Sequence, residues 1–106
     1  MNCHIQLTER AFASLESFAE SVAFDIFAQI DLLAKFPQMG SPLGPRFPSL
    51  DGYRQLIHSR RMRIIYDHDE LENSVYILAI NNCRQDLPSP RQLRRDRQSD
   101  GELPLE

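Results

Sequence analysis

Arginine side chains beside three short apolar runs are the groups of this chain best placed to do chemistry. The runs cover residues 53–58, 62–68 and 74–83, and these arginines lie within or beside them: Arg54, Arg60, Arg61, Arg63 and Arg84. A guanidinium group is a flat fork of donors that fits a phosphate bidentately. The spacing therefore predicts three strands that present arginines along one side, as a candidate surface for phosphate or RNA.

A site that cleaves RNA would also need groups that take and give protons. His58 is the histidine that the turn expected after it would bring near the arginines, and its pKa lies near neutrality, so it could act as base or acid. Structural roles are open for the same arginines. Arg63 could pair with Asp67 on the same strand face, and Arg84 could bridge to Asp86.

The charge of the chain is locally basic but acidic overall. The net charge is −3 and the pI is about 5.6, which argues against a general nucleic-acid coat protein. Residues 44–66 nevertheless hold five arginines and one acid, and residues 83–97 hold five arginines and two acids. Two basic blocks in an acidic frame permit a local anion site.

Metal, cofactor and membrane roles have no support in the sequence. Cys3 and Cys83 lie far apart, and no Cys/His cluster has zinc spacing. No apolar stretch has the length of a membrane span, and the first residues lack the regions of a signal peptide. We therefore expect a reduced cytoplasmic protein with no metal and no cofactor.

The periodicity of apolar residues predicts an α+β domain over residues 1–86. A short strand at 3–7 is followed by helical spacing from Thr8, a candidate N-cap, to Phe36. One fused helix or two helices meeting near Glu20-Ser21 would satisfy the spacing, and two are preferred on length. The connector 37–52 holds too many proline and glycine residues for regular structure. A three-stranded antiparallel meander follows, with its last strand apolar on both faces and so central.

Residues 87–106 form a polar tail. Ser89-Pro90 could open a short helix through Arg97, but few large apolar residues are present. We expect the tail to be partly disordered, to add little to core stability, and to become ordered against a partner or a second copy.

The order of these elements resembles the RelE/ParE superfamily of bacterial toxins, nearer its ParE and plasmid-stabilisation side. The resembling features are a helix end with Leu, Phe-Pro and Gly, a Gly-x-Arg-x-Leu strand, an Arg-hydrophobic-hydrophobic-Tyr strand, and a final strand ending in Arg-x-Asp. They lie at Leu33–Gly40, Gly52–Leu56, Arg63–Tyr66, and Val75–Ile80 with Arg84-Gln85-Asp86. The resemblance spans about residues 5–88, although the helical section is shorter than usual in ParE-like members and the tail is unlike the family's ending.

The resemblance implies a toxin of a type II toxin–antitoxin system that binds a target such as DNA gyrase. A cognate antitoxin would neutralise it, docking in an apolar groove that the short helices leave open, and the toxin would be a homodimer or part of a hetero-oligomer. One alternative is a metal-independent mRNA endonuclease that acts on the ribosome through attack of the RNA 2′-hydroxyl. A second alternative is a degenerate member without toxicity.

Site residues follow from the same resemblance. In the endonuclease alternative, Arg63 would hold the scissile phosphate, Arg84 would stabilise developing charge, and His58 would transfer protons. The absence of a histidine or tyrosine after Arg84 argues against this alternative. Arg54, Arg60 and Arg61 are candidates for phosphate or target binding, although Arg54 in this family often serves the fold.

Overall fold

The computed structural model describes residues 2–85, 87–98 and 103–105. The chain forms one mixed sheet in the order β2-β3-β4-β5-β1-β6, in which β1 runs parallel to β5 and the other neighbours are antiparallel. The α+β prediction is confirmed. The elements are β1 (His4–Leu7), α1 (Glu9–Ser17), α2 (Glu20–Lys35), β2 (Ser41–Pro42), β3 (Arg54–His58), β4 (Met62–Asp69), β5 (Ser74–Asn82), α3 (Pro90–Gln98) and β6 (Leu103–Leu105).

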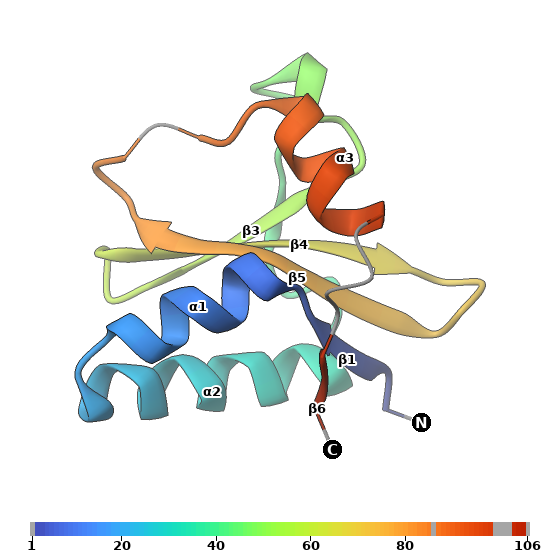
Figure 1. Cartoon of the computed structure of the whole chain (residues 1–106). Coiled ribbons are helices and arrows are strands. Elements are labelled where there is room, and N and C mark those ends of the chain that lie inside the picture. The colour runs from blue at the N-terminus through green and yellow to red at the C-terminus, as the bar shows by residue number, and fades with distance from the viewer. Residues whose placement is uncertain (1, 86, 99–102, 106) are drawn as a thin grey trace.

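Two separate helices cover one face of the sheet, as preferred from the sequence (Figure 1). The Thr8 hydroxyl accepts a hydrogen bond from the backbone N–H of Ala11 and donates to the carbonyl of Ile77, so it caps α1 and ties it to β5. The backbone is extended at Phe18 and Ala19, which ends α1 just before the expected break at Glu20-Ser21.

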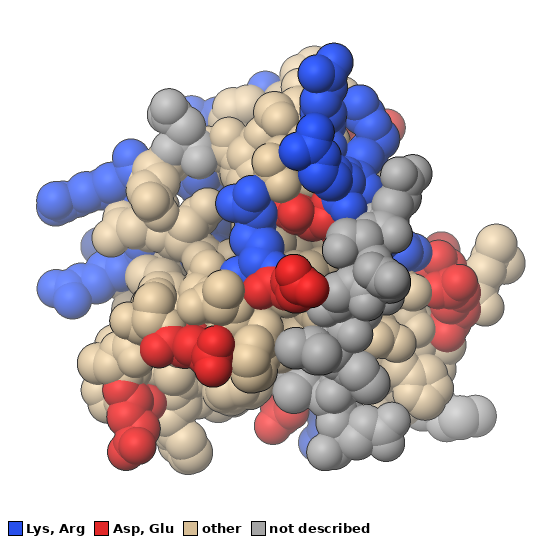
Figure 2. Space-filling model, in the orientation of Figure 1, with Lys and Arg blue, Asp and Glu red and all other residues tan. Residues whose placement is uncertain are grey.

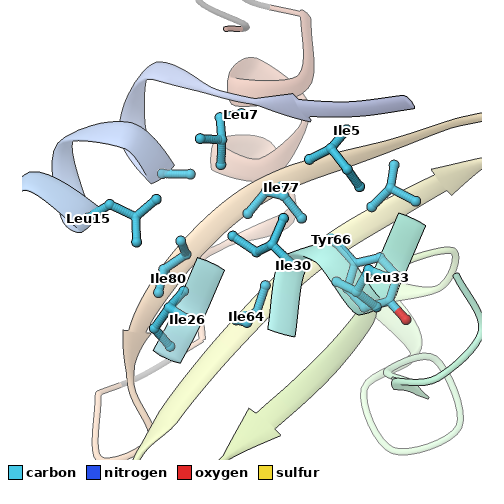
Figure 3. Packing of buried hydrophobic residues seen from close by; sticks show 12 residues of the cluster. Ile5, Leu7, Leu15, Ile26, Ile30, Leu33, Ile64, Tyr66, Ile77 and Ile80 are labelled. Atoms are coloured by element: carbon cyan, nitrogen blue, oxygen red, sulfur yellow. The ribbon is translucent and has the colours of Figure 1, made fainter. Parts of the chain in front are cut away.

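The core has two layers because β5 buries both of its faces. The helix-side cluster fills the space between α1, α2 and the sheet (Figure 3). A bulge beside Ile65 and Tyr66 shifts the register of β4 against β5. The helix-side cluster contains Ile5, Leu7, Ala11, Leu15, Ile26, Ile30, Leu33, Ile64, Tyr66, Val75, Ile77 and Ile80, and the opposite cluster contains Leu43, Leu50, Ile65, Tyr76, Leu78, Ala79 and Leu93.

The connector 37–52 is more regular than its composition predicts. Ser41 and Pro42 form β2 at the sheet edge, where a proline is tolerated because one side needs no ladder bonds. A 3₁₀ turn at Pro48–Leu50 follows. Two leucines that are nearly fully buried, Leu43 and Leu50, hold this segment against the second face of the sheet.

The described part of the tail packs on the sheet, which differs from the expectation that it adds little to the core. Helix α3 lies on the face opposite α1 and α2, and its Leu93 is fully buried (Figure 1). The guanidinium of Arg97 reaches Asp67 and Asp69 on β4, and β6 pairs with β1. One leucine and one arginine at suitable positions anchor a helix that overall hydropathy marks as polar.

Candidate functional site

The turn between β3 and β4 has an unfavourable backbone conformation. The backbone N–H of Arg61 donates to the carbonyl of His58 at 3.1 Å, and φ is +54° at Ser59 and +60° at Arg60. Positive φ at both central positions defines a type I′ turn, which favours Asn-Gly over the Ser-Arg found here. Strain of this kind costs on the order of 1 kcal/mol per residue and is common where a side chain has a function. The turn leaves Arg60 and Arg61 exposed.

A network of hydrogen bonds holds the segment after β5 beside this turn. The backbone N–H of Cys83 donates to the carbonyl of Arg61 at 2.7 Å. The Asn82 side-chain oxygen accepts from the N–H of Arg84 at 2.8 Å, while the Gln85 side-chain oxygen accepts from the N–H of Asn82 at 3.0 Å. These bonds fix residues 82–85 in a compact loop with Arg84 exposed.

The turn and the loop together enclose a hollow of about 290 Å³, which we call the arginine hollow. It is lined by Arg60, Arg61, Asn82 and Arg84. Figure 2 shows arginine or lysine side chains projecting from this end of the sheet, at the left of the view. In the part of the chain that the structure describes, which leaves out Asp86, these three arginines form no ion pair. The hollow can therefore accept a phosphate or carboxylate group.

Arg63 is bound to the loop that carries Arg84. Its two terminal nitrogens donate to the carbonyl of Cys83 at 3.4 Å and to that of Gln85 at 3.5 Å. The suggested pair with Asp67 does not form, because Asp67 instead receives a hydrogen bond from Arg97.

Arg54 lies at the other end of β3 and serves the fold. Its guanidinium donates to the carbonyl of Gly40 at 2.7 Å and lies 3.4 Å from that of Gln38. The Tyr66 hydroxyl joins the same corner: it donates to the carbonyl of Pro37 at 2.8 Å and accepts from the N–H of Gly40 at 2.9 Å. Burial raises the pKa of Tyr66, and the hydrogen bond from the Gly40 N–H and, to a smaller extent, the charge of Arg54 oppose that rise. This corner pins the end of the helical layer to the sheet.

His58 and Arg63 lie on opposite faces of the sheet. His58 pairs with Met62, whose side chain packs against the helix-side cluster, and neighbouring strand residues alternate between faces. Arg63 follows Met62 and so lies on the other face. The structure thus brings Arg60, Arg61 and Arg84 to one hollow and bonds Arg63 to the loop that carries Arg84, whereas the side chains of Arg54 and His58 are not among the described lining residues.

Sequence reasoning missed Asn82 and Gln85, whose side chains build the loop. Asparagine often accepts a hydrogen bond from the backbone N–H two residues later and so forms a tight turn. This preference could have indicated Asn82 as a loop-forming residue. No comparable signal predicts the strained turn. Within the described residues, no group of three or more His, Cys, Asp or Glu could hold a metal ion, and no helix has the length and hydropathy to cross a membrane.

Comparisons with known proteins identify relatives of this fold. The family model of the ParE toxin of the type II toxin–antitoxin system parDE matches residues 5–87. The toxin–antitoxin complex RelBE2 from Mycobacterium tuberculosis is similar with a TM-score of 0.67 and 19% identity, covering 77% of this chain and 99% of that one. The isolated E. coli RelE toxin gives 0.64 and 13%, covering 79% and 87%. No curated protein sequence matches. At these identities the solved structures establish the fold alone, and the family match establishes that the chain belongs to the ParE toxin family of type II toxin–antitoxin systems.

Proposed function

We propose that this toxin acts in the cytoplasm by binding a cellular target such as DNA gyrase, with the arginine hollow as the contact surface. Three exposed guanidinium groups on one end of a sheet attract an acidic or phosphate-bearing surface and speed its encounter. The shape of the hollow and the fixed loop behind it would limit which anionic groups can enter.

The observation that carries the proposal is that, among the residues that the structure describes, no proton-transfer group lines the hollow. Cleavage of RNA by its own 2′-hydroxyl needs a base and an acid near the phosphate. The lining residues in the described part of the chain, which leaves out Asp86, are three arginines and an asparagine, and a guanidinium stays protonated at neutral pH. His58 lies on the opposite face from Arg63, and the hydroxyl of Tyr66 is bound to Pro37 and Gly40. This arrangement favours binding over catalysis.

Two assays on the purified toxin separate the candidate targets. We expect inhibition of DNA supercoiling by gyrase, and no specific cleavage of mRNA on ribosomes. Replacing Arg60, Arg61 and Arg84 together by alanine should abolish the inhibition while the fold, followed by circular dichroism, is retained. A matched control removes the same charge from exposed arginines of α3: Arg91, Arg94 and Arg95.

The control variant should inhibit gyrase as the wild type does. Equal loss in both variants would mean that total charge, and not the hollow, determines binding. Specific mRNA cleavage by the wild type would overturn the proposal and support the endonuclease alternative. Inactivity in both assays would exclude gyrase and the ribosome as the toxin's targets.

We also propose that the cognate antitoxin docks on the outer flank of α2. Leu32 lies in the last turn of α2 and Phe36 is the residue that ends the helix, where its backbone N–H donates to the carbonyl of Leu32 at 2.8 Å. Their exposed fractions are 39% and 58%. Exposed apolar neighbours of this kind mark interaction surfaces. Leu32→Glu should weaken capture of the toxin by its antitoxin. Leu71→Glu, the same chemical change at a fully exposed position in the turn between β4 and β5, is the matched control and should not. Equal capture of both variants would place the antitoxin elsewhere.

A further inference from the structure

We infer that Arg63 is a positioning residue: it holds the loop that aims Arg84 into the arginine hollow, and it does not itself contact the bound anion. This inference rests on the proposed function of the hollow as an anion-binding surface. It gives Arg63 a role different from that of a phosphate ligand, and it makes the hollow a preformed site for one carboxylate or phosphate group.

Arg63 contacts the two residues that flank Arg84 in the sequence. One terminal nitrogen donates to the carbonyl of Cys83 and the other to the carbonyl of Gln85, the residues directly before and after Arg84. A guanidinium fork can hold two carbonyls at once, which a single ammonium cannot do in the same geometry. The fork therefore restrains the peptide unit directly before Arg84 and the one that follows Gln85.

The remaining nitrogen of Arg63 is directed into the protein. Its Nε atom is buried, and so is the side-chain oxygen of Asn81, which lies opposite Arg63 in the register of β4 and β5. Neither atom has a hydrogen-bond partner among the described residues. The buried Nε and the two carbonyl bonds thus direct three of the five N–H donors of Arg63 at its own chain. Arg84, by contrast, is exposed and lines the hollow.

The rest of the loop supports the same role. Its side-chain bonds, from the Asn82 oxygen and the Gln85 oxygen, act on backbone N–H groups, so they set the path of the chain. Arg63 adds the only side-chain contacts to carbonyls of residues 83–85 in the described part of the chain. Preorganisation of this kind improves affinity because less ordering remains to be done on binding.

A double-mutant cycle on the toxin alone tests the inference, with inorganic pyrophosphate as the probe and NMR titration as the readout. Arg63→Lys keeps the charge and removes the fork, so it leaves the long-range field of the site nearly unchanged. We expect Arg84→Ala to weaken pyrophosphate binding about tenfold or more, as loss of a charge-assisted contact does. Arg63→Lys should weaken it about three- to tenfold in the wild-type background and have no further effect in the Arg84→Ala background.

Equal weakening by Arg63→Lys in both backgrounds would show that Arg63 contacts the anion directly and would overturn the inference. Wild-type affinity in Arg63→Lys would overturn it as well, as would a wild-type toxin that does not bind pyrophosphate. Arg91→Ala on α3 is the control for loss of one exposed arginine and should bind as the wild type does. Amide hydrogen exchange gives a second readout: Arg63→Lys should increase exchange at Arg84 and Gln85 while leaving β5 protected.

Failure of this inference and failure of the proposed function are distinguishable. The cycle measures anion binding without any macromolecular target, so it can succeed when gyrase is not inhibited. Conversely, gyrase inhibition that depends on Arg84 can stand even when the cycle shows direct contact by Arg63.

Discussion

Replacing Leu93 by alanine tests whether α3 is part of the folded body in solution. Leu93 is fully buried, and α3 packs through it against β5 and the 43–50 segment. Core substitutions of leucine by alanine cost about 2–5 kcal/mol, through lost transfer free energy and the cavity left behind. Because α3 is short, it can detach instead of tolerating a cavity. The free energy of docking α3 therefore sets the upper limit of the loss.

The other contacts of α3 indicate the size of that limit. Arg97 Nε lies 3.2 Å from Asp67, its Nη2 lies 3.1 Å from Asp69, and its guanidinium carbon lies 3.4 Å from the centre of the Tyr76 ring. Partly exposed ion pairs contribute about 0.2–1 kcal/mol each, and a cation–π contact about 0.5–1 kcal/mol. Together with Leu93, these contacts can support a docking free energy of a few kcal/mol. We therefore expect Leu93→Ala to cost about 2–4 kcal/mol and to lower the melting midpoint by roughly 10–25 °C.

Thermal and urea unfolding followed by circular dichroism provide the assay, with hydrogen exchange to locate the change on α3. Leu71→Ala makes the same chemical change at a fully exposed position and should leave the midpoint unchanged. Equal midpoints for the Leu93 and Leu71 variants would refute the reasoning and would show that α3 is not packed in solution. Deletion of residues 88–106 should also lower the midpoint, contrary to the expectation from composition alone.

Two further predictions concern the corner that joins the helical layer to the sheet. A Cβ atom at Gly40 would lie 2.5 Å from the carbonyl oxygen of Gln55, so Gly40→Ala should cost about 1–3 kcal/mol in urea unfolding, and no loss would mean that the corner is looser than described. Burial raises the pKa of Tyr66 and of Tyr53 above their ordinary value of 10.0, so the folded state holds these protons more tightly than the unfolded state does. The contribution of these two tyrosines to stability should therefore be constant up to pH about 10 and fall above it, and Tyr66→Phe should reduce that fall.

Much of the fold could be predicted because its determinants are local. The hydroxyl of Thr8 caps a helix wherever the backbone N–H three residues later is free to donate to it. The helical spacing of the apolar residues that follow predicts which face of the helix is buried. The apolar run of β5 indicated a strand buried on both faces, and the structure confirms it. Local rules do not fix register, however. The register skips Leu78 of β5 opposite Ile65 and Tyr66, so Leu78 and Ala79 both pack in the opposite cluster, and no residue type predicts this bulge.

The site was less predictable because it depends on contacts across the sheet. Arg63 has the residue type of a phosphate ligand, but its donors are directed to the carbonyls of Cys83 and Gln85, which lie twenty or more positions away. Similarly, the low hydropathy of the tail predicts a polar segment. Only the burial of Leu93 in the opposite cluster shows that α3 packs on the sheet. Residue type limits the chemistry of a position, and the fold then determines whether that chemistry faces solvent.

The turn at Ser59 and Arg60 gives a last prediction, in which stability and binding change in opposite directions. Both residues have positive φ, which asparagine and glycine adopt at lower cost. Replacing the pair by Asn-Gly should stabilise the fold by about 1–2 kcal/mol, because it relieves strain in the folded state. It should also weaken target binding, because it removes Arg60 from the hollow.

Ser59→Asn alone separates the two effects. It keeps Arg60 and should raise the melting midpoint by a smaller amount with binding intact. A turn that gains no stability from Asn-Gly would not be left-handed in solution, and the argument from strain would then be wrong. Stabilisation with binding retained would show instead that Arg60 is dispensable. The family-motif residues at the corner between the helical layer and the sheet use their polar groups within the fold: Arg54, Tyr66 and Gly40. We therefore expect the target-binding surface at positions such as this turn, where the sequence can change while the fold is kept.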